Sequence, residues 1–130
     1  MEQILKFLKD SGVFYIATQD GSQPRVRPFG AIAKINGKIC LITGKKKDVY
    51  KQIKKNPKIE ISSMYDNKWL RLSADAVELD DRDARVEMLK QNPSLSGMYN
   101  PDDGVMAVLA LENADAKICS FTEAPVEIRF

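Results

Sequence analysis

The sequence contains no histidine, and this absence removes the side chain most often used in catalytic and metal sites. Ser-His-Asp and Cys-His nucleophilic catalysis, histidine metal triads and histidine proton shuttles are therefore excluded. The only two cysteines, Cys40 and Cys119, lack the close spacing of a metal-binding motif. We expect no metal site, and we expect that any redox or group-transfer chemistry would come from a bound organic cofactor.

Long apolar runs are also absent. No segment approaches the roughly 20 apolar residues that a membrane-spanning helix needs. The chain begins Met-Glu-Gln-Ile-Leu-Lys, with no basic region followed by an apolar block. Both cysteines lie in apolar, strand-like runs, which is typical of buried free thiols in a reducing compartment. The sequence also allows a disulfide between them. We expect a cytoplasmic protein that does not associate with membranes.

A strong net charge is the third absence. The formal net charge is only +2 over 130 residues, so positive charge is local and concentrated between Lys45 and Lys58. Nucleic-acid-binding proteins normally present a wider basic surface, and we expect no nucleic-acid partner. A chain of this length can bury a core without disulfides or metal, and no linker interrupts it. We expect one domain over residues 1–130.

Apolar residues at helical spacing predict three helices, and apolar β-branched runs predict six to seven strands, mainly antiparallel. Strands in hairpin order with helices between them indicate a mainly β fold, a β-barrel with flanking helices. The expected helices span residues 2–11, 48–55 (capped by Asp48) and 81–91 (capped by Asp80 or Asp81). The expected strands span 13–18, 23–35, 38–44, 59–64, 69–79, 105–111 and 116–121, with a short last strand at 126–130 left open.

A hairpin in the first half of the chain is the strongest local pattern. Two apolar runs joined by Asn36-Gly37 predict a type I′ turn, because this turn needs positive φ at both positions. Arg25 and Arg27 stand two residues apart in the first arm, so both side chains leave the same face of a strand. Pro24 and Pro28 cannot donate to a strand ladder, which predicts an edge or a bulge at this point.

The second arm of the hairpin ends in Thr43-Gly44, followed by Lys45-Lys46-Lys47 and the start of a helix. A hydroxyl, ammonium groups and guanidiniums beside a helix start are the donors that bind a phosphate. Each feature also has a structural interpretation: surface ion pairs for the arginines, a solvated turn for the lysines, and a locally satisfied hydroxyl for the threonine. The residues alone leave both interpretations open.

Several motifs follow one another in the sequence: Phe-Tyr-Ile-Ala-Thr, Asp-Gly, Gln-Pro-Arg-Val-Arg-Pro-Phe-Gly, Thr-Gly-Lys-Lys-Lys-Asp-Val-Tyr-Lys-Gln-Ile-Lys-Lys-Asn-Pro, Lys-Trp-Leu-Arg-Leu-Ser-Ala and Ser-Phe-Thr-Glu-Ala-Pro. Their order resembles the pyridoxamine 5′-phosphate oxidase-like flavoproteins, in the branch grouped with nitroimidazole-resistance proteins. The resemblance covers nearly the whole chain. It implies an FMN-binding split β-barrel that forms a homodimer with two FMN sites at the subunit interface.

The resemblance also implies which residues contact the cofactor. The family pattern places FMN contacts on the strand around the two arginines and at the strand end before the three lysines. One of those lysines usually holds the phosphate, and we favour Lys47, then Lys46. Trp69 either lines the flavin pocket or the dimer interface, or is a half-buried core aromatic. The expected cofactor-binding residues are Arg25, Val26, Arg27, Pro28, Phe29, Thr43, Lys46, Lys47 and Trp69.

The resemblance implies an oxidoreductase of small molecules in which FMN carries electrons from a reduced nicotinamide, NADH or NADPH, or from a small substrate. No side chain stands out as an acid or base, so no catalytic residue is assigned. Vitamin B6 oxidation is not expected, because the substrate residues of the true oxidases are not recognisable. Nitroimidazole-related activity is in doubt, because the chain lacks the histidine of the members that have one.

Two alternatives remain at this point. The first is a flavin-binding carrier or sensor that does not turn over. The second is a cofactor-free interaction domain that binds RNA or an acidic partner through residues 45–58, although no aromatic residue for base stacking lies among these lysines apart from Tyr50. The sequence does not distinguish FMN from FAD or the deazaflavin F420.

Overall fold

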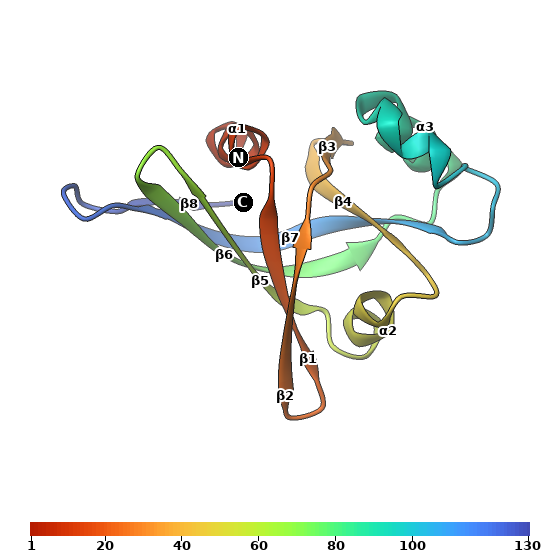
Figure 1. The fold of residues 1–130 in the computed structure, drawn as a ribbon, viewed down its shortest axis with the longest axis horizontal. Helices are drawn as coiled ribbons and strands as arrows, with labels where there is room; N and C mark the ends of the chain where they lie inside the picture. Colours follow the sequence, from red (N-terminus) through yellow and green to blue (C-terminus); the bar gives the residue numbers. More distant parts are fainter.

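The computed structural model describes residues 1–130 and places eight strands in one antiparallel sheet (Figure 1). The order along the sheet is β2-β1-β5-β6-β7-β4-β3, and β8 pairs with β7. The strands are β1 (Phe14–Asp20), β2 (Gln23–Phe29), β3 (Ile32–Ile35), β4 (Lys38–Gly44), β5 (Lys58–Tyr65), β6 (Lys68–Glu78), β7 (Met106–Cys119) and β8 (Val126–Arg129). The helices are α1 (Glu2–Ser11), α2 (Asp48–Lys55), α3 (Arg82–Gln91) and a 3-10 helix, η1 (Pro93–Gly97). The mainly β class with flanking helices is confirmed.

The sheet is a split barrel, because its two end strands, β2 and β3, follow one another in the sequence and are separated by Gly30 and Ala31. Its interior holds a cluster of 22 buried residues to which α1 and α2 contribute, including Ile4, Phe14 and Leu72. Along β6, every second side chain from Leu70 to Ala76 points into this core, because successive side chains of a strand alternate between its two faces.

A second core of nine buried residues lies beneath α3, which contributes Ala84 and Met88. Because the first half of β7 is covered on both faces, its residues from Met106 to Leu111 are all buried. A strand buried on both faces reads as a continuous apolar run instead of an alternating one. No helix in the structure has the length and apolar character needed to cross a membrane.

Several local predictions are confirmed. Asn36 and Gly37 adopt φ values of 52° and 74°, as a type I′ turn requires. The predicted helix over residues 2–11 is also present, and Gly12 follows its last residue with a φ of 75°, a conformation that favours glycine. Asp81 caps α3 by accepting a hydrogen bond from the Asp83 amide. The edge position of β2 accommodates its two prolines, which have no amide hydrogen to donate.

Three predicted boundaries are wrong. The arm expected at 23–35 is two strands, because the backbone leaves β2 at Phe29 and joins β3 at the opposite end of the sheet. The strands expected at 105–111 and 116–121 are one strand, β7, in which Asn113 has a φ of 52° at a register shift against β6. Asp48 is the first helical residue of α2 and not its cap, since Lys47 takes the N-cap position without a capping side chain.

Candidate functional site

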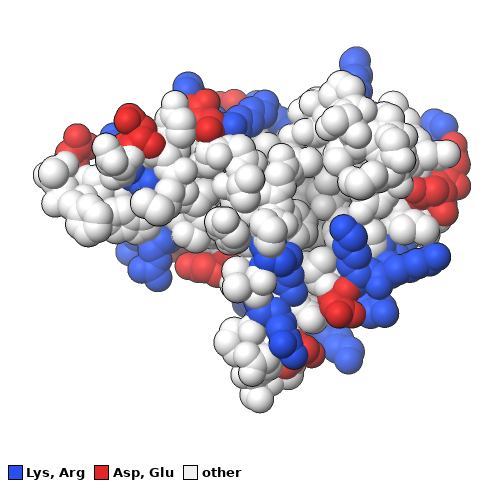
Figure 2. All heavy atoms as spheres, in the orientation of Figure 1, with Lys and Arg blue, Asp and Glu red and all other residues white.

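A polar groove lies between the β1–β2 hairpin and α2. It has a volume of about 1010 Å³ and is lined mainly by polar and charged residues of these two elements. Figure 2 shows Lys and Arg side chains gathered over α2 and along the facing side of the hairpin. The lining cations are Arg25, Arg27, Lys47, Lys51 and Lys55, against the two acids Asp20 and Asp48.

Arg27 occupies the floor of this groove and is held from two sides. Its Nη1 donates to the carbonyl oxygen of Ile16 at 3.3 Å and to Oγ1 of Thr18 at 2.7 Å, and its Nη2 donates to Oε1 of Gln52 at 2.7 Å. Partial burial lowers the pKa of the Arg27 guanidinium below its ordinary value, and Arg25 acts in the same direction while Asp48 opposes it. The guanidinium remains charged, because arginine does not lose its proton in proteins.

An apolar chamber adjoins the groove. Its volume is about 320 Å³, and it lies between the end of β2, the end of β4, the N-terminus of α2 and the segment around η1. The groove and the chamber share Arg27, Lys47 and Val49. The chamber is lined by Arg27, Pro28, Phe29, Gly30, Ala31, Ile42, Thr43, Lys47, Val49, Asn92, Ser94, Leu95, Met98 and Tyr99.

Thr43 carries an unpaired hydroxyl in the wall of the chamber. The residue is 2% exposed, and its Oγ1 has no hydrogen-bond partner within the chain. A buried polar group without a partner destabilises a fold, so the Thr43 hydroxyl is open to a partner from outside the chain. The interpretation of Thr43 as a strand residue that satisfies its hydroxyl locally is therefore wrong.

Replacement of Thr43 by valine is expected to stabilise the ligand-free protein by about 1 kcal/mol, because valine has the same shape and removes the unpaired hydroxyl. Urea unfolding measures this difference. Thr18→Val is the matched control: Thr18 donates to Gln52 at 2.5 Å and accepts from Arg27, so its loss is expected to cost about 1–2 kcal/mol. Equal destabilisation by both changes would mean that the Thr43 hydroxyl is bonded in solution.

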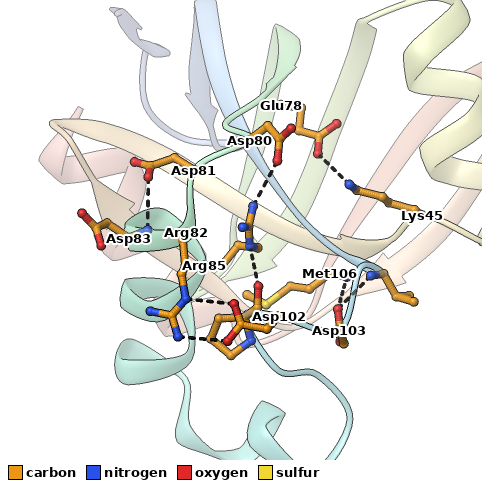
Figure 3. A network of polar contacts seen from close by, with 12 residues as sticks. Lys45, Glu78, Asp80, Asp81, Arg82, Asp83, Arg85, Asp102, Asp103 and Met106 are labelled. Atoms are coloured by element: carbon orange, nitrogen blue, oxygen red, sulfur yellow. Dashed lines mark hydrogen bonds and ion pairs between the residues drawn. The ribbon is translucent and has the colours of Figure 1, made fainter.

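A network of ion pairs and backbone contacts fixes the loop that follows Tyr99 and leads into β7 (Figure 3). Arg82 holds Asp102 through two hydrogen bonds of 2.9 and 3.0 Å, and Arg85 donates to the carbonyl oxygen of Pro101 at 2.8 Å. The carboxylate of Asp103 accepts hydrogen bonds from the amides of Met106, Val105 and Asn100, and these bonds lower its pKa. The chamber wall is therefore anchored to α3 and to the start of β7.

The Glu78 carboxylate at the end of β6 joins this side of the molecule to α2. It accepts from the Tyr50 hydroxyl at 2.7 Å and from Lys54 at 3.0 Å, and Lys45 lies 3.8 Å away. Burial raises the pKa of Glu78, but the hydrogen bonds from Tyr50 and Lys54 and the nearby ammonium charges outweigh burial, so the pKa lies below its ordinary value of 4.5. A depressed carboxyl pKa stabilises the fold above the ordinary pKa, and this contribution is lost as the pH falls through the folded-state pKa.

Glu78→Gln is therefore expected to lower the free energy of unfolding at neutral pH by about 1–3 kcal/mol, since it leaves the two ammonium groups beside a neutral amide. The gap to the unsubstituted protein should close below the folded-state pKa, where Glu78 is itself neutral. Urea unfolding along a pH series measures both effects. Glu60→Gln is the control, because Glu60 forms no ion pair, and a gap that persists at acid pH would contradict the assignment.

The structure brings together most of the residues expected at a cofactor site. Arg27 and Lys47 line both cavities; Pro28, Phe29 and Thr43 line the chamber; Arg25 and Val26 line the groove. Two expected residues lie elsewhere. Lys46 is exposed and lines neither cavity, and Trp69 lies near the β5–β6 turn, with its ring centroid 4.9 Å from that of Phe121.

Sequence reasoning missed the residues that support Arg27 and those that close the chamber. Thr18 and Gln52 hold the guanidinium, and no local pattern links them because they are 34 positions apart. Met98 lines the chamber and is 70% exposed. Lys51 and Lys55 also line the groove, and their spacing from Lys47 places all three on one side of α2. No group of three or more metal-ligating side chains lies together.

Comparisons with known proteins agree with this architecture. The sequence model of the family described as pyridoxamine 5′-phosphate oxidase matches residues 1–116. A NimC/NimA family protein from Clostridium acetobutylicum is 41% identical, with a TM-score of 0.98 over 100% of this chain and 92% of that chain. No curated protein matches the chain.

More distant structures share the fold alone. General stress protein 26 from Bacillus anthracis is 14% identical, with a TM-score of 0.78 over 99% of this chain and 97% of that chain. A heme binding protein from Mycobacterium smegmatis is 13% identical, with a TM-score of 0.73 over 92% of this chain and 53% of that chain. The family match and the relative at 41% identity show that the chain belongs to the pyridoxamine 5′-phosphate oxidase-like split-barrel family.

Proposed function

We propose that this protein is a cytoplasmic flavoprotein that binds FMN and acts as an oxidoreductase of small molecules. The observation that carries the proposal is the junction of the cationic groove and the apolar chamber at Arg27 and Lys47, with the unpaired Thr43 hydroxyl in the chamber wall. A ligand that suits this junction has an anionic group at one end and a flat, largely apolar ring at the other. FMN has this form.

The residues at the junction fit a phosphate. Three of the five N–H groups of Arg27 are used within the chain, so two remain for a ligand. Lys47 forms no ion pair, and the Thr43 hydroxyl has no partner. Charge-assisted hydrogen bonds from guanidinium and ammonium groups are the strongest donors for a phosphate dianion. Arg27, Lys47 and Thr43 would together hold this group.

The chamber fits the ring. Phe29, Ile42 and Leu95 supply apolar walls, and Met98 lies exposed at the mouth. When bound, a flavin supplies the capacity to accept and return electrons, and the chain orients the ring and excludes water from it. Reduced nicotinamide or a small reduced substrate would be the electron donor. The chamber offers no carboxylate, so we assign no acid or base to the chain.

Two other cofactor roles differ from this proposal in testable ways. A carrier or sensor would bind FMN without turnover, and mixing the loaded protein with NADH, NADPH and an acceptor separates it from an enzyme. Haem is the second case, raised by the distant heme binding protein. This chain has no histidine, so the commonest axial haem ligand is absent, and the cationic groove favours an anionic ligand.

The first test is a fluorescence-quenching titration of the protein with FMN and with riboflavin, which lacks the phosphate. We expect FMN to bind about a hundredfold more tightly than riboflavin, since at least two charge-assisted hydrogen bonds depend on the phosphate. Equal affinity for the two flavins would mean that the phosphate contributes nothing to binding and would contradict the assigned phosphate site. Failure to bind either flavin would reject the cofactor and favour the cofactor-free interaction domain.

We include a homodimer in this proposal. Half-buried Trp69 and the neighbouring Phe121, which is 92% exposed, form an apolar pair at the surface, and Met64, opposite Trp69 in the sheet, is 70% exposed. Because Trp69 lines neither cavity of its own chain, it would contact a flavin only across a subunit interface. Light scattering coupled to size exclusion measures the mass, and Phe121→Ser is expected to shift it toward the monomer.

A further inference from the structure

Three lysines form a row along the groove side of α2. Lys47, Lys51 and Lys55 are spaced four residues apart and all line the groove. None of them forms an ion pair, and neither does Lys46, whereas Lys45, Lys54 and Lys58 on the same segment have carboxylate partners. Like charges four residues apart destabilise a helix. Within α2 this repulsion acts between Lys51 and Lys55, since Lys47 is the N-cap, and an anion lying against them would relieve it.

The row is too long for a single phosphate. A helix rises about 1.5 Å per residue, so the row extends about 12 Å along the axis. Arg25 faces it from the hairpin, where its Nε lies 3.2 Å from Asp20. The phosphate assigned above engages only the Arg27 and Lys47 end. Lys51 and Lys55 extend beyond that phosphate and are left without an anion.

We propose that the groove is a second anion subsite, which binds the distal phosphate of a flavin extended through a pyrophosphate, as in FAD. This inference rests on the proposed function, since it takes the first phosphate to lie at Arg27 and Lys47. The extension of FAD is attached at that phosphate and would continue into the groove toward Lys51 and Lys55. The amide side chains of Gln19 and Asn56 line the same groove and offer donors and acceptors to a ribose and an adenine.

Charge balance in the groove favours a short nucleotide over a nucleic acid. Five cations face two acids, Asp20 and Asp48, which would repel a continuous phosphate backbone. No aromatic side chain lines the groove, so it offers no stacking platform for successive bases. A ligand with two linked phosphates matches both features.

The experiment is a paired titration with FMN and FAD at low and moderate ionic strength. We expect FAD to bind about tenfold more tightly than FMN at low salt, with the advantage shrinking as salt screens the lysine row. The double variant Lys51→Gln/Lys55→Gln should lower the FAD affinity about tenfold and the FMN affinity by less than about threefold. The control is Lys9→Gln/Lys90→Gln, because these lysines lie on α1 and α3, away from the groove.

The other outcomes of this titration contradict the second subsite, and they distinguish its failure from failure of the proposed function. FMN binding without a gain for FAD, or equal losses of both flavins in the Lys51/Lys55 variant, would reject the second subsite and leave the proposed function standing. Failure of both flavins to bind would reject the subsite together with the function. Displacement of bound FAD by a short single-stranded RNA, lost in the same variant, would show that the row belongs to a nucleic-acid surface.

Discussion

Replacement of Arg27 by methionine is expected to weaken FMN binding about a hundredfold. Methionine keeps an unbranched apolar stem but removes every donor of the guanidinium. Two charge-assisted hydrogen bonds, each with a net value of about 1.5–3 kcal/mol, would be lost to the phosphate. An equilibrium constant changes tenfold for about every 1.4 kcal/mol, so the expected loss is about 3 kcal/mol or more.

Arg27→Met should also lower the stability of the ligand-free protein, because it removes the hydrogen bonds that the guanidinium donates to the Ile16 carbonyl, Thr18 and Gln52. Calorimetric titration with FMN measures the affinity, and thermal unfolding shows how much protein is folded at the titration temperature. Arg27→Lys retains a point charge and should lose only about tenfold. Arg71→Met is the control, since Arg71 is exposed on β6, away from both cavities. If folded Arg27→Met binds FMN with unchanged affinity, Arg27 does not contact the cofactor.

Phe14→Ala is expected to have the largest effect on stability, a loss of about 3–5 kcal/mol in the free energy of unfolding. Phe14 is 0% exposed in the larger core, and its ring packs against Phe29 with centroids 6.2 Å apart. Truncation leaves a cavity next to the side chain that forms part of the chamber wall. The same substitution should therefore loosen the chamber as well as the barrel.

Tyr15 provides the matched control for Phe14. It is the next residue of β1, points to the other face of the sheet and is 49% exposed, so Tyr15→Ala should cost less than about 1 kcal/mol. Urea unfolding measures both changes. If Phe14→Ala does not fold, Phe14→Leu should fold with a loss of about 1 kcal/mol and reduced FMN affinity. Equal costs at the two positions would contradict the burial pattern of β1.

The parts of the fold that sequence predicts well are those decided by neighbouring residues. The Asn36-Gly37 turn, the glycine that ends α1 and the Asp81 cap each depend on the backbone preference of one or two residues. The errors lie where pairing between strands far apart in the sequence decides where a strand begins or ends. Asn113 resembles the start of a turn, yet β6 pairs with β7 on both sides of it and keeps the strand continuous.

The candidate site shows the same division. The resemblance to the family implied that Arg27, Thr43 and Lys47 contact the cofactor, and the fold places all three in the lining of one chamber. The supporting contacts were not predictable, because Gln52 reaches Arg27 only after α2 has packed against β1. An unpaired hydroxyl is likewise a property of the packed structure, and nothing in the residues around Thr43 indicates it.

The central position of β7 has a consequence for the order in which the chain folds during synthesis. β7 pairs with β6, β4 and β8, so the β3–β4 hairpin has no partner strand until residues 106–119 have left the ribosome. Pairing between segments so far apart in sequence is slow, because the loop between them must close first. The apolar β4 strand therefore lacks its β7 partner while residues 45–105 are being synthesised. We expect nascent chains that end before Met106 to leave β4 without its β7 partner and therefore to remain incompletely folded.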